Sequence, residues 1–357
     1  MKRIILFTVS LLTSFCSATA GVYIVPTTTS PWDFPRVKVM VDHQGPFTVE
    51  LDTGSDTFMV PGNKRICPSC KTRMGLAPSG PLGREFHSNY DGGSRLIAHQ
   101  YRTTVQMVDK EHTAKTPVVM QTVGLIVSAN SQGGSPIMGM AQPVHPKQGD
   151  TTTYMEALMN EHHVSSLAFM LVGCPHPHKG TRLVLGGIDP RLSHQKPKTV
   201  PILPHKPHYD ITPVSIGISG SSAILGHFGL DVSVDSGTTE IGLPARLYVP
   251  VINALKKRTH LPDSFWKRKG TRLTSQQIAS LPALVVHFAN NITLSVPARS
   301  YVIPDPRKKS LKLLMIKNFG KRKYTVFGAT FLSAFAVEFN RSQNTLSFYS
   351  NHGLCRR

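Results

Sequence analysis

Residues 49–55 read Val-Glu-Leu-Asp-Thr-Gly-Ser, and residues 232–238 repeat the pattern as Val-Ser-Val-Asp-Ser-Gly-Thr. In each copy a short run that begins with valine and has apolar residues at its first and third positions leads to a carboxylate. A hydroxyl residue, a glycine and a second hydroxyl residue follow. This pattern is typical of a buried strand that leads into a tight turn, where glycine permits close backbone approach and the hydroxyls can donate to the carboxylate. A single Asp-hydroxyl-Gly tripeptide is weak evidence, but two copies whose Asp residues lie 183 positions apart indicate a duplication.

The duplication extends beyond these motifs. Gly139 follows Asp52 by 87 residues in an Ile-Met-Gly segment, and Gly328 follows Asp235 by 93 residues in a Val-Phe-Gly segment. A half-chain period is too long for a solenoid of short repeats. The sequence therefore predicts two homologous lobes, each contributing one carboxylate to a shared cleft.

With these motifs in place, the chain resembles the pepsin-like aspartic proteases. Further matches are residues 89–94 (NYDGGS), which are similar to the family's flap, and residues 183–189 (LVLGGID). In the second half, residues 234–239, 261–266 and 327–329 are most similar to the β-secretase (memapsin) branch. The resemblance covers nearly the whole mature chain and implies an all-β, bilobal fold with a few short helices.

The resemblance implies an aspartic endopeptidase whose catalytic residues are Asp52 and Asp235. Two carboxylates held close together in a dry cleft cannot both ionise, so the pair shares one proton and activates a bound water. Neighbouring hydroxyls are expected to link the two turns and to donate to the carboxylates, and the glycines to allow their close approach. These supporting residues are Thr53, Gly54, Ser55, Ser236, Gly237 and Thr238. No cofactor is required, and the irregular spacing of the histidines favours no metal site.

Tyr90 is expected on a β-hairpin flap with Gly92 and Gly93 at its tip, where closure would exclude water and orient the substrate. The alternative is an ordinary tyrosine in a surface turn. Where the family usually has Trp shortly after the first motif, this chain has Met59, so the pocket beneath the tyrosine should be softer.

The 357 residues, 40% apolar and 17% charged, suit a β-rich globular protein of two domains. Residues 1–20 have a basic start, an apolar run and small residues at the end, which predicts a secretory signal rather than an anchor helix. We expect an N-terminal lobe over 21–180 and a C-terminal lobe over 181–357. Cleavage after Ala20 would leave 31 residues before Asp52, too few for the usual prosegment, and no later run is apolar enough for a transmembrane anchor.

Short apolar or alternating runs between turn residues predict strands, and helical patterns are few. The predicted strands are 37–41, 47–51, 101–108, 118–127, 167–172, 284–288 and 334–339. The predicted helices are 152–160 and 247–258.

Without the predicted signal, four cysteines remain, an even number that suits an oxidising compartment. The resemblance to β-secretase-like chains pairs Cys174 with Cys355. Cys67 and Cys70 form a C-x-x-C motif, which is compatible with redox chemistry or half a zinc site, but a small structural disulfide is favoured because no second such motif exists. Asn291 and Asn340 stand in glycosylation sequons.

The net charge of +20 is unusual for the family. It would attract acidic substrates, anionic membranes or sulfated glycans and favour carboxylate ionisation, unless it only keeps the surface solvated. No motif supports specific nucleic-acid binding. We expect a monomer, secreted or within the secretory or lysosomal pathway, that cleaves polypeptides. The alternative is a catalytically weak binding protein that uses the same cleft or its basic surface.

Overall fold

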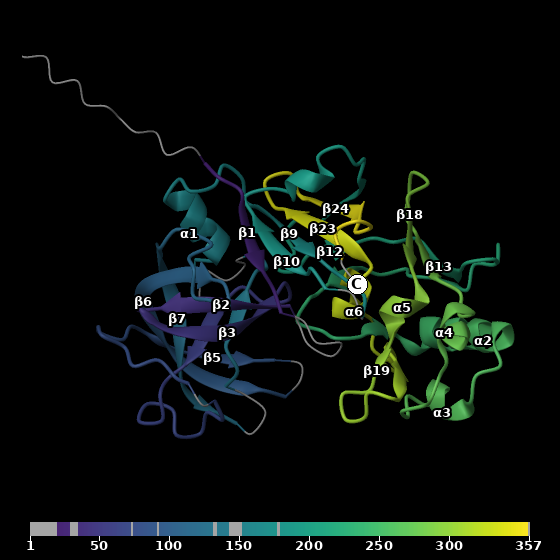
Figure 1. The fold of residues 1–357 in the computed structure, drawn as a ribbon, viewed down its shortest axis with the longest axis horizontal. Helices are drawn as coiled ribbons and strands as arrows, with labels where there is room; N and C mark the ends of the chain where they lie inside the picture. The colour runs from purple at the N-terminus through teal and green to yellow at the C-terminus, as the bar shows by residue number, and fades with distance from the viewer. Residues whose placement is uncertain are drawn as a thin grey trace, which may run out of the picture.

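The structure is a computed structural model, and it describes residues 20–28, 35–72, 74–90, 93–130, 134–142, 152–176 and 179–355. The predicted signal peptide, apart from Ala20, and Gly92 lie outside these residues. Strands dominate, with a few short helices, and the all-β bilobal fold expected from the sequence is confirmed (Figure 1). Within the described residues, no helix combines the length and apolarity needed to cross a bilayer.

A seven-stranded sheet forms the N-terminal part, at the left of Figure 1, in the order β2-β3-β8-β4-β7-β6-β5. In β2 and β6 buried positions alternate with more exposed ones, whereas β4 is buried along its whole length. The strands are β2 (Arg36–Val41), β3 (Gln44–Asp52), β4 (Phe58–Pro61), β5 (Glu85–Asn89), β6 (Arg95–Val108), β7 (Val119–Ala129) and β8 (Ile137–Gly139).

A second, six-stranded sheet joins the two halves of the chain in the order β1-β10-β9-β23-β24-β11. The predicted division near residue 180 falls between β9 and β10, which are paired neighbours in this sheet. Any two lobes divided there therefore share a sheet. The strands are β1 (Tyr23–Pro26), β9 (Ala168–Val172), β10 (Arg182–Leu185), β11 (Lys198–Pro201), β23 (Phe335–Asn340) and β24 (Thr345–Ser350).

The C-terminal part, at the right of Figure 1, contains three smaller sheets. The five-stranded one has β12 (Asp210–Ile211), β15 (Val232–Val234), β22 (Thr325–Phe327), β16 (Ile241–Leu243) and β21 (Ile316–Asn318). The four-stranded one has β14 (Gly226–His227), β13 (Ser215–Ile218), β17 (Leu284–His287) and β18 (Thr293–Val296). The third pairs β19 (Val302–Pro304) with β20 (Lys312–Leu314).

The duplication predicted from the sequence is present in the strand topology. In the first half β3 runs parallel to β8, β8 antiparallel to β4, and β4 parallel to β7. In the second half β15 runs parallel to β22, β22 antiparallel to β16, and β16 parallel to β21. Each Asp motif follows the first strand of its set, so the same backbone arrangement positions both carboxylates.

The two predicted helices are present with shifted starts. Helix α1 (Tyr154–Asn160) begins after Thr153, whose side chain forms a capping box with Glu156. Helix α2 (Ala245–Arg258) begins directly after Pro244, two residues before the predicted start. Four helices of four or five residues were not predicted, because one turn has too little hydrophobic periodicity to recognise. They are α3 (Asp263–Trp266), α4 (Ser275–Ala279), α5 (Ala298–Tyr301) and α6 (Ala329–Leu332).

Candidate active site

Asp52 lies at the end of β3 and Asp235 directly follows β15, and the two turns bind their carboxylates in the same way. The backbone N–H of Gly54 donates to Asp52 Oδ1 at 2.8 Å, and that of Gly237 donates to Asp235 Oδ1 at 2.8 Å. The Ser55 hydroxyl donates to Asp52 Oδ2 at 2.6 Å. In the second turn, the Thr238 hydroxyl donates to Asp235 Oδ2, also at 2.6 Å. Each carboxylate is thus held in the plane of its own turn.

Thr53 and Ser236, both fully buried, link the two turns through reciprocal hydrogen bonds. The backbone N–H of Thr53 donates to Ser236 Oγ at 3.0 Å, and that of Ser236 donates to Thr53 Oγ1 at 2.9 Å. Each hydroxyl then donates across to the opposite strand, Thr53 to Val234 O at 2.9 Å and Ser236 to Leu51 O at 2.6 Å. Four buried bonds between segments over 180 residues apart therefore set the relative position of the carboxylates.

The two glycines allow the carboxylates to approach each other. A Cβ at Gly54 would lie 2.5 Å from Asp235 Oδ1. A Cβ at Gly237 would collide with Asp52 Oδ1 and lie 3.1 Å from Asp235 Oδ1. The inner oxygens of both carboxylates therefore surround the space that a side chain at Gly237 would fill, so only glycine fits there.

The environment of Asp52 favours its protonated form. Burial raises the pKa of the Asp52 carboxyl well above its ordinary value, because desolvation penalises the charge, and the neighbouring Asp235 raises it further. The hydrogen bonds from Ser55 and Gly54 act in the opposite direction. A proton is consequently retained by the pair where an isolated aspartate would have lost it.

Tyr90 lies at the end of β5, in the turn that leads to β6. Backbone bonds from Tyr90 to Ser94 and from Gly93 to Tyr90, both 2.9 Å, close this hairpin. The half-buried Tyr90 side chain directs its hydroxyl at Met59 Sδ, 3.8 Å away. The sulfur is a weak acceptor in place of an indole donor. Burial and the charges of Asp52 and Asp56 raise the pKa of Tyr90, so its hydroxyl stays protonated.

Tyr90 packs on a small apolar cluster, of which the sequence analysis expected only Met59 beneath the tyrosine. The cluster includes Met59, Phe86 and the disulfide-bonded Cys67 and Cys70. The predicted Cys67–Cys70 disulfide is therefore present, and it supports the floor beneath the flap tyrosine. Only the alternation of β5, which places Phe86 inward, could have indicated this contact.

An open cleft of about 940 Å³ contains both carboxylates and Tyr90. Charged residues on loops complete its lining, among them Asp56, Lys206, Asp231 and Lys323. The Lys206 ammonium lies 3.1 Å from Asp231 Oδ2. Sequence reasoning missed these residues because they stand in loops without a motif. In the described part of the chain, no three His, Cys, Asp or Glu side chains gather as a metal site would need.

Residues 37–350 match the eukaryotic aspartyl protease family. The chain belongs to this family. Similar proteins include pregnancy-associated glycoprotein 1 of Sus scrofa, with 25% identity over 84% of this chain and 76% of the relative. Pepsin A of Gallus gallus is 22% identical over 84% of this chain and 79% of the relative. Renin-2 of Mus musculus is 24% identical over 85% of this chain and 75% of the relative. The identity to these relatives is 22–25%.

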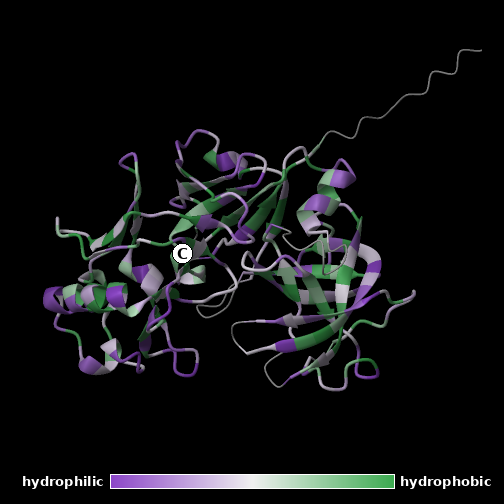
Figure 2. Cartoon of the chain, turned by 180° about the vertical axis from the view of Figure 1, so that it is seen from behind, coloured by the Kyte–Doolittle hydropathy of each residue, from purple (hydrophilic) through white to green (hydrophobic). Residues whose placement is uncertain are grey.

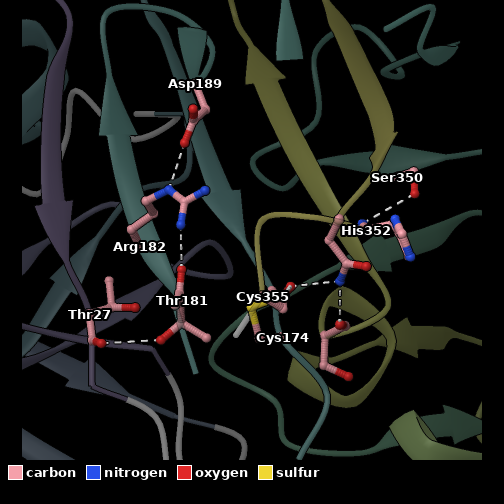
Figure 3. The surroundings of a disulfide bond; sticks show 12 residues. Thr27, Cys174, Thr181, Arg182, Asp189, Ser350, His352 and Cys355 are labelled. Atoms are coloured by element: carbon pink, nitrogen blue, oxygen red, sulfur yellow. Dashed lines mark hydrogen bonds and ion pairs between the residues drawn. A yellow bond between two sulfur atoms is a disulfide. The ribbon is translucent and has the colours of Figure 1, made fainter. Parts of the chain in front are cut away.

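The second disulfide joins Cys174 to Cys355, as expected, and anchors the C-terminal segment beside the six-stranded sheet (Figure 3). In the same region Arg182 Nε donates to the buried Asp189 at 2.6 Å, and Arg191 adds bonds of 2.9 and 3.0 Å. These arginines hold the pKa of Asp189 far below its ordinary value despite burial, which acts to raise it. The Asp189 motif of the family resemblance is thus a structural ion-pair site, and Asp189 does not line the cleft that contains the two carboxylates.

The two sequons differ in exposure. Asn291 is exposed in the turn between β17 and β18. Asn340 is 7% exposed at the end of β23, where its Nδ2 donates to Glu338 at 3.2 Å. Since a glycan needs the amide nitrogen accessible, the geometry favours Asn291 as the acceptor.

Proposed function

We propose that this protein is a secreted aspartic endopeptidase that hydrolyses polypeptides between its two lobes, with Asp52 and Asp235 as its catalytic residues. The observation that supports this most strongly is the matched pair of carboxylate turns, interlocked by Thr53 and Ser236. Burying two carboxylates side by side destabilises a fold. An arrangement that nevertheless supplies each one with two donors is better explained by use than by architecture.

The chemistry follows from the shared proton. The ionised carboxylate removes a proton from a water as its oxygen attacks the peptide carbonyl carbon, and the protonated carboxyl donates its proton to the carbonyl oxygen. The tetrahedral diol collapses as the carbon–nitrogen bond breaks. The leaving amine takes up the proton that the first carboxylate removed from water, and a diol hydroxyl returns a proton to the second carboxylate, which restores the dyad. Closure of the Tyr90 hairpin over the cleft would exclude bulk water during these steps. We infer that Gly93 gives the hairpin its conformational freedom.

Further parts of the proposal come from the sequence. The signal over 1–20 would direct the chain to the secretory pathway, and the lobes would divide near residue 180. Residues 261–266 support a relationship to the β-secretase branch. We propose a monomer that needs no cofactor.

The test is hydrolysis of a quenched fluorescent peptide library between pH 3 and 7, with and without pepstatin. Pepstatin-sensitive cleavage by the native protein, and its loss in Asp235→Asn and Asp52→Asn, is the expected result. Either variant that retains native activity would remove that aspartate from the mechanism. Circular dichroism and thermal unfolding of the variants show whether the fold is intact.

The alternative is a binding protein that retains the cleft but hydrolyses peptides slowly or not at all. One observation favours it: Met59 gives the flap tyrosine only a weak sulfur acceptor at 3.8 Å. A folded protein that binds pepstatin, measured by calorimetry, without cleaving any library peptide would support this alternative against the peptidase.

A further inference from the structure

The positive charge of this protein is concentrated in one part of the chain. Residues 241–325 contain 17 Lys and Arg but only two acidic residues, Asp263 and Asp305. This segment therefore accounts for 15 of the 20 net positive charges. A solvated surface that only maintains solubility would need no such concentration.

The fold gathers this charge onto neighbouring loops. Thr271 and Lys312 form two backbone hydrogen bonds, of 3.1 and 2.7 Å, which hold the loop after α3 against the β19–β20 hairpin. A Cβ at Gly270 would lie 2.8 Å from both Asp305 and Leu311, so these loops are in close contact. Only four residues separate the end of α2 from the start of α3, which limits Arg258 to within about 18 Å of Asp263.

We call seven exposed cations of these loops and of the last turn of α2 the basic face, which leaves out Arg258, a donor to Gly220 O, and Arg307, the partner of Asp305. It comprises Lys256, Lys257, Lys267, Lys269, Arg272, Lys308 and Lys309. Figure 2 shows the corresponding hydrophilic colouring on α2, on α3 and on the loop after β19, at the left and lower left of the view. None of the seven lines the catalytic cleft.

The charge of the basic face is not neutralised by the rest of the described chain. None of its seven cations has an ion-pair partner among the residues that the structure describes. Of the nearby acids, Asp305 is buried and already paired with Arg307, and Glu240 is paired with Arg268 and Lys317. Asp263, exposed at the start of α3, is the acid that remains.

We propose that the basic face is a binding site for a sulfated polysaccharide. The segments that carry the basic face, residues 256–272 and 305–312, contain no large hydrophobic side chain that is strongly exposed. In the wider segment 241–325 the exposed ones are Val249, in α2, and Tyr324, in the cleft lining. A membrane-binding surface would present apolar anchors between its cations, and a surface for single-stranded nucleic acid would present aromatic rings for stacking. A linear polysaccharide that carries sulfate groups needs, for binding, only cations spread over a folded surface. The site is separate from the proposed peptidase chemistry and does not depend on it.

The test measures binding of a heparin-derived oligosaccharide by fluorescence anisotropy at 0.15 M NaCl, where charges act over only about 8 Å. The variant Lys308→Glu/Lys309→Glu reverses two cations of the face. The control Lys71→Glu/Lys110→Glu reverses two exposed lysines on the N-terminal part, so both variants change the net charge equally. We expect the first variant to lose on the order of tenfold in affinity and the control to change much less, because polyanion affinity depends on local cation contacts.

Equal losses in the two variants would show that net charge alone governs binding and would overturn the proposal. So would equal affinity for the chemically desulfated oligosaccharide. Tighter binding to vesicles containing phosphatidylserine, or to duplex DNA, would replace the polysaccharide with that partner. Thermal unfolding of each variant confirms the fold, and binding can be read whether or not the protein cleaves peptides.

Discussion

Replacing Thr53 with valine tests whether the interlock beneath the dyad sets both stability and catalysis. Valine keeps the β-branched shape but removes the hydroxyl, which accepts from the Ser236 N–H at 2.9 Å and donates to Val234 O at 2.9 Å. Thr53 and Ser236 are both fully buried, so water cannot replace the lost partner. The variant therefore leaves a buried N–H without an acceptor.

The expected loss can be worked from these contacts. An unsatisfied buried N–H destabilises by about 1–3 kcal/mol, and the second lost bond contributes about 1 kcal/mol. Thr53→Val should thus lower the free energy of unfolding by about 2–4 kcal/mol. The matched control is Thr53→Ser, which keeps the hydroxyl and loses one buried methyl, at about 1 kcal/mol.

Urea unfolding and peptide cleavage give the two readouts. Because small displacements of catalytic groups lower rates strongly, we expect kcat to fall by roughly 100-fold in Thr53→Val and by much less in Thr53→Ser. Equal destabilisation of the two variants would refute the reasoning, since it would assign the effect to the methyl group. Unchanged kcat in a destabilised Thr53→Val would show that the interlock supports the fold but not the dyad.

Three further outcomes are expected. Ser55→Ala removes a bond that lowers the pKa of Asp52, the carboxyl that retains the shared proton, so the alkaline limb of kcat/KM against pH should move to higher pH; a shift to lower pH would contradict this. Asp189 has a depressed pKa, so its ionised form stabilises the fold above about pH 4, and this stabilisation is lost as the pH falls. In urea unfolding, Asp189→Asn should therefore lower the free energy of unfolding by about 3 kcal/mol at pH 7 and by less at pH 3. After expression through a eukaryotic secretory pathway, Asn291→Gln should increase electrophoretic mobility and Asn340→Gln should not; a shift in Asn340→Gln alone would reverse the assignment.

The duplicated features of the chain were the most predictable from sequence. The motifs around Asp52 and Asp235 carry strand, turn and hydrogen-bonding information in adjacent residues, so their local geometry follows from short-range chemistry. The seven predicted strands all coincide with observed strands, because each has an apolar face that only a sheet can bury. Gly139 and Gly328 were recognised only as repeat markers. The structure shows why both are glycines: a Cβ at either would collide with backbone atoms of the turn after its Asp.

Features that depend on contacts between distant segments were not predictable. Nothing around Cys67 indicates that the Cys67–Cys70 disulfide lies under Tyr90, since residues of β4, β5, β6 and β7 complete the cluster between them. Likewise, Lys308 and Lys267 are clustered by the Thr271–Lys312 pairing, which no sequence period encodes. The sequence gives the position of each charge along the chain, but the pairing of distant segments determines which charges lie close together in space.

The effect of the net charge on the two carboxylates also depends on where the charges lie in space. From composition alone, a charge of +20 should favour ionised carboxylates and lower their titration range. At Asp52 the local environment acts the other way, because burial and Asp235 raise its pKa. The seven cations of the basic face lie outside the cleft, whose own lining contains Lys323 and the ion pair of Lys206 with Asp231. At physiological ionic strength charges beyond about 8–10 Å are largely screened, so the basic face can bind a polyanion without altering the proton shared by the carboxylates.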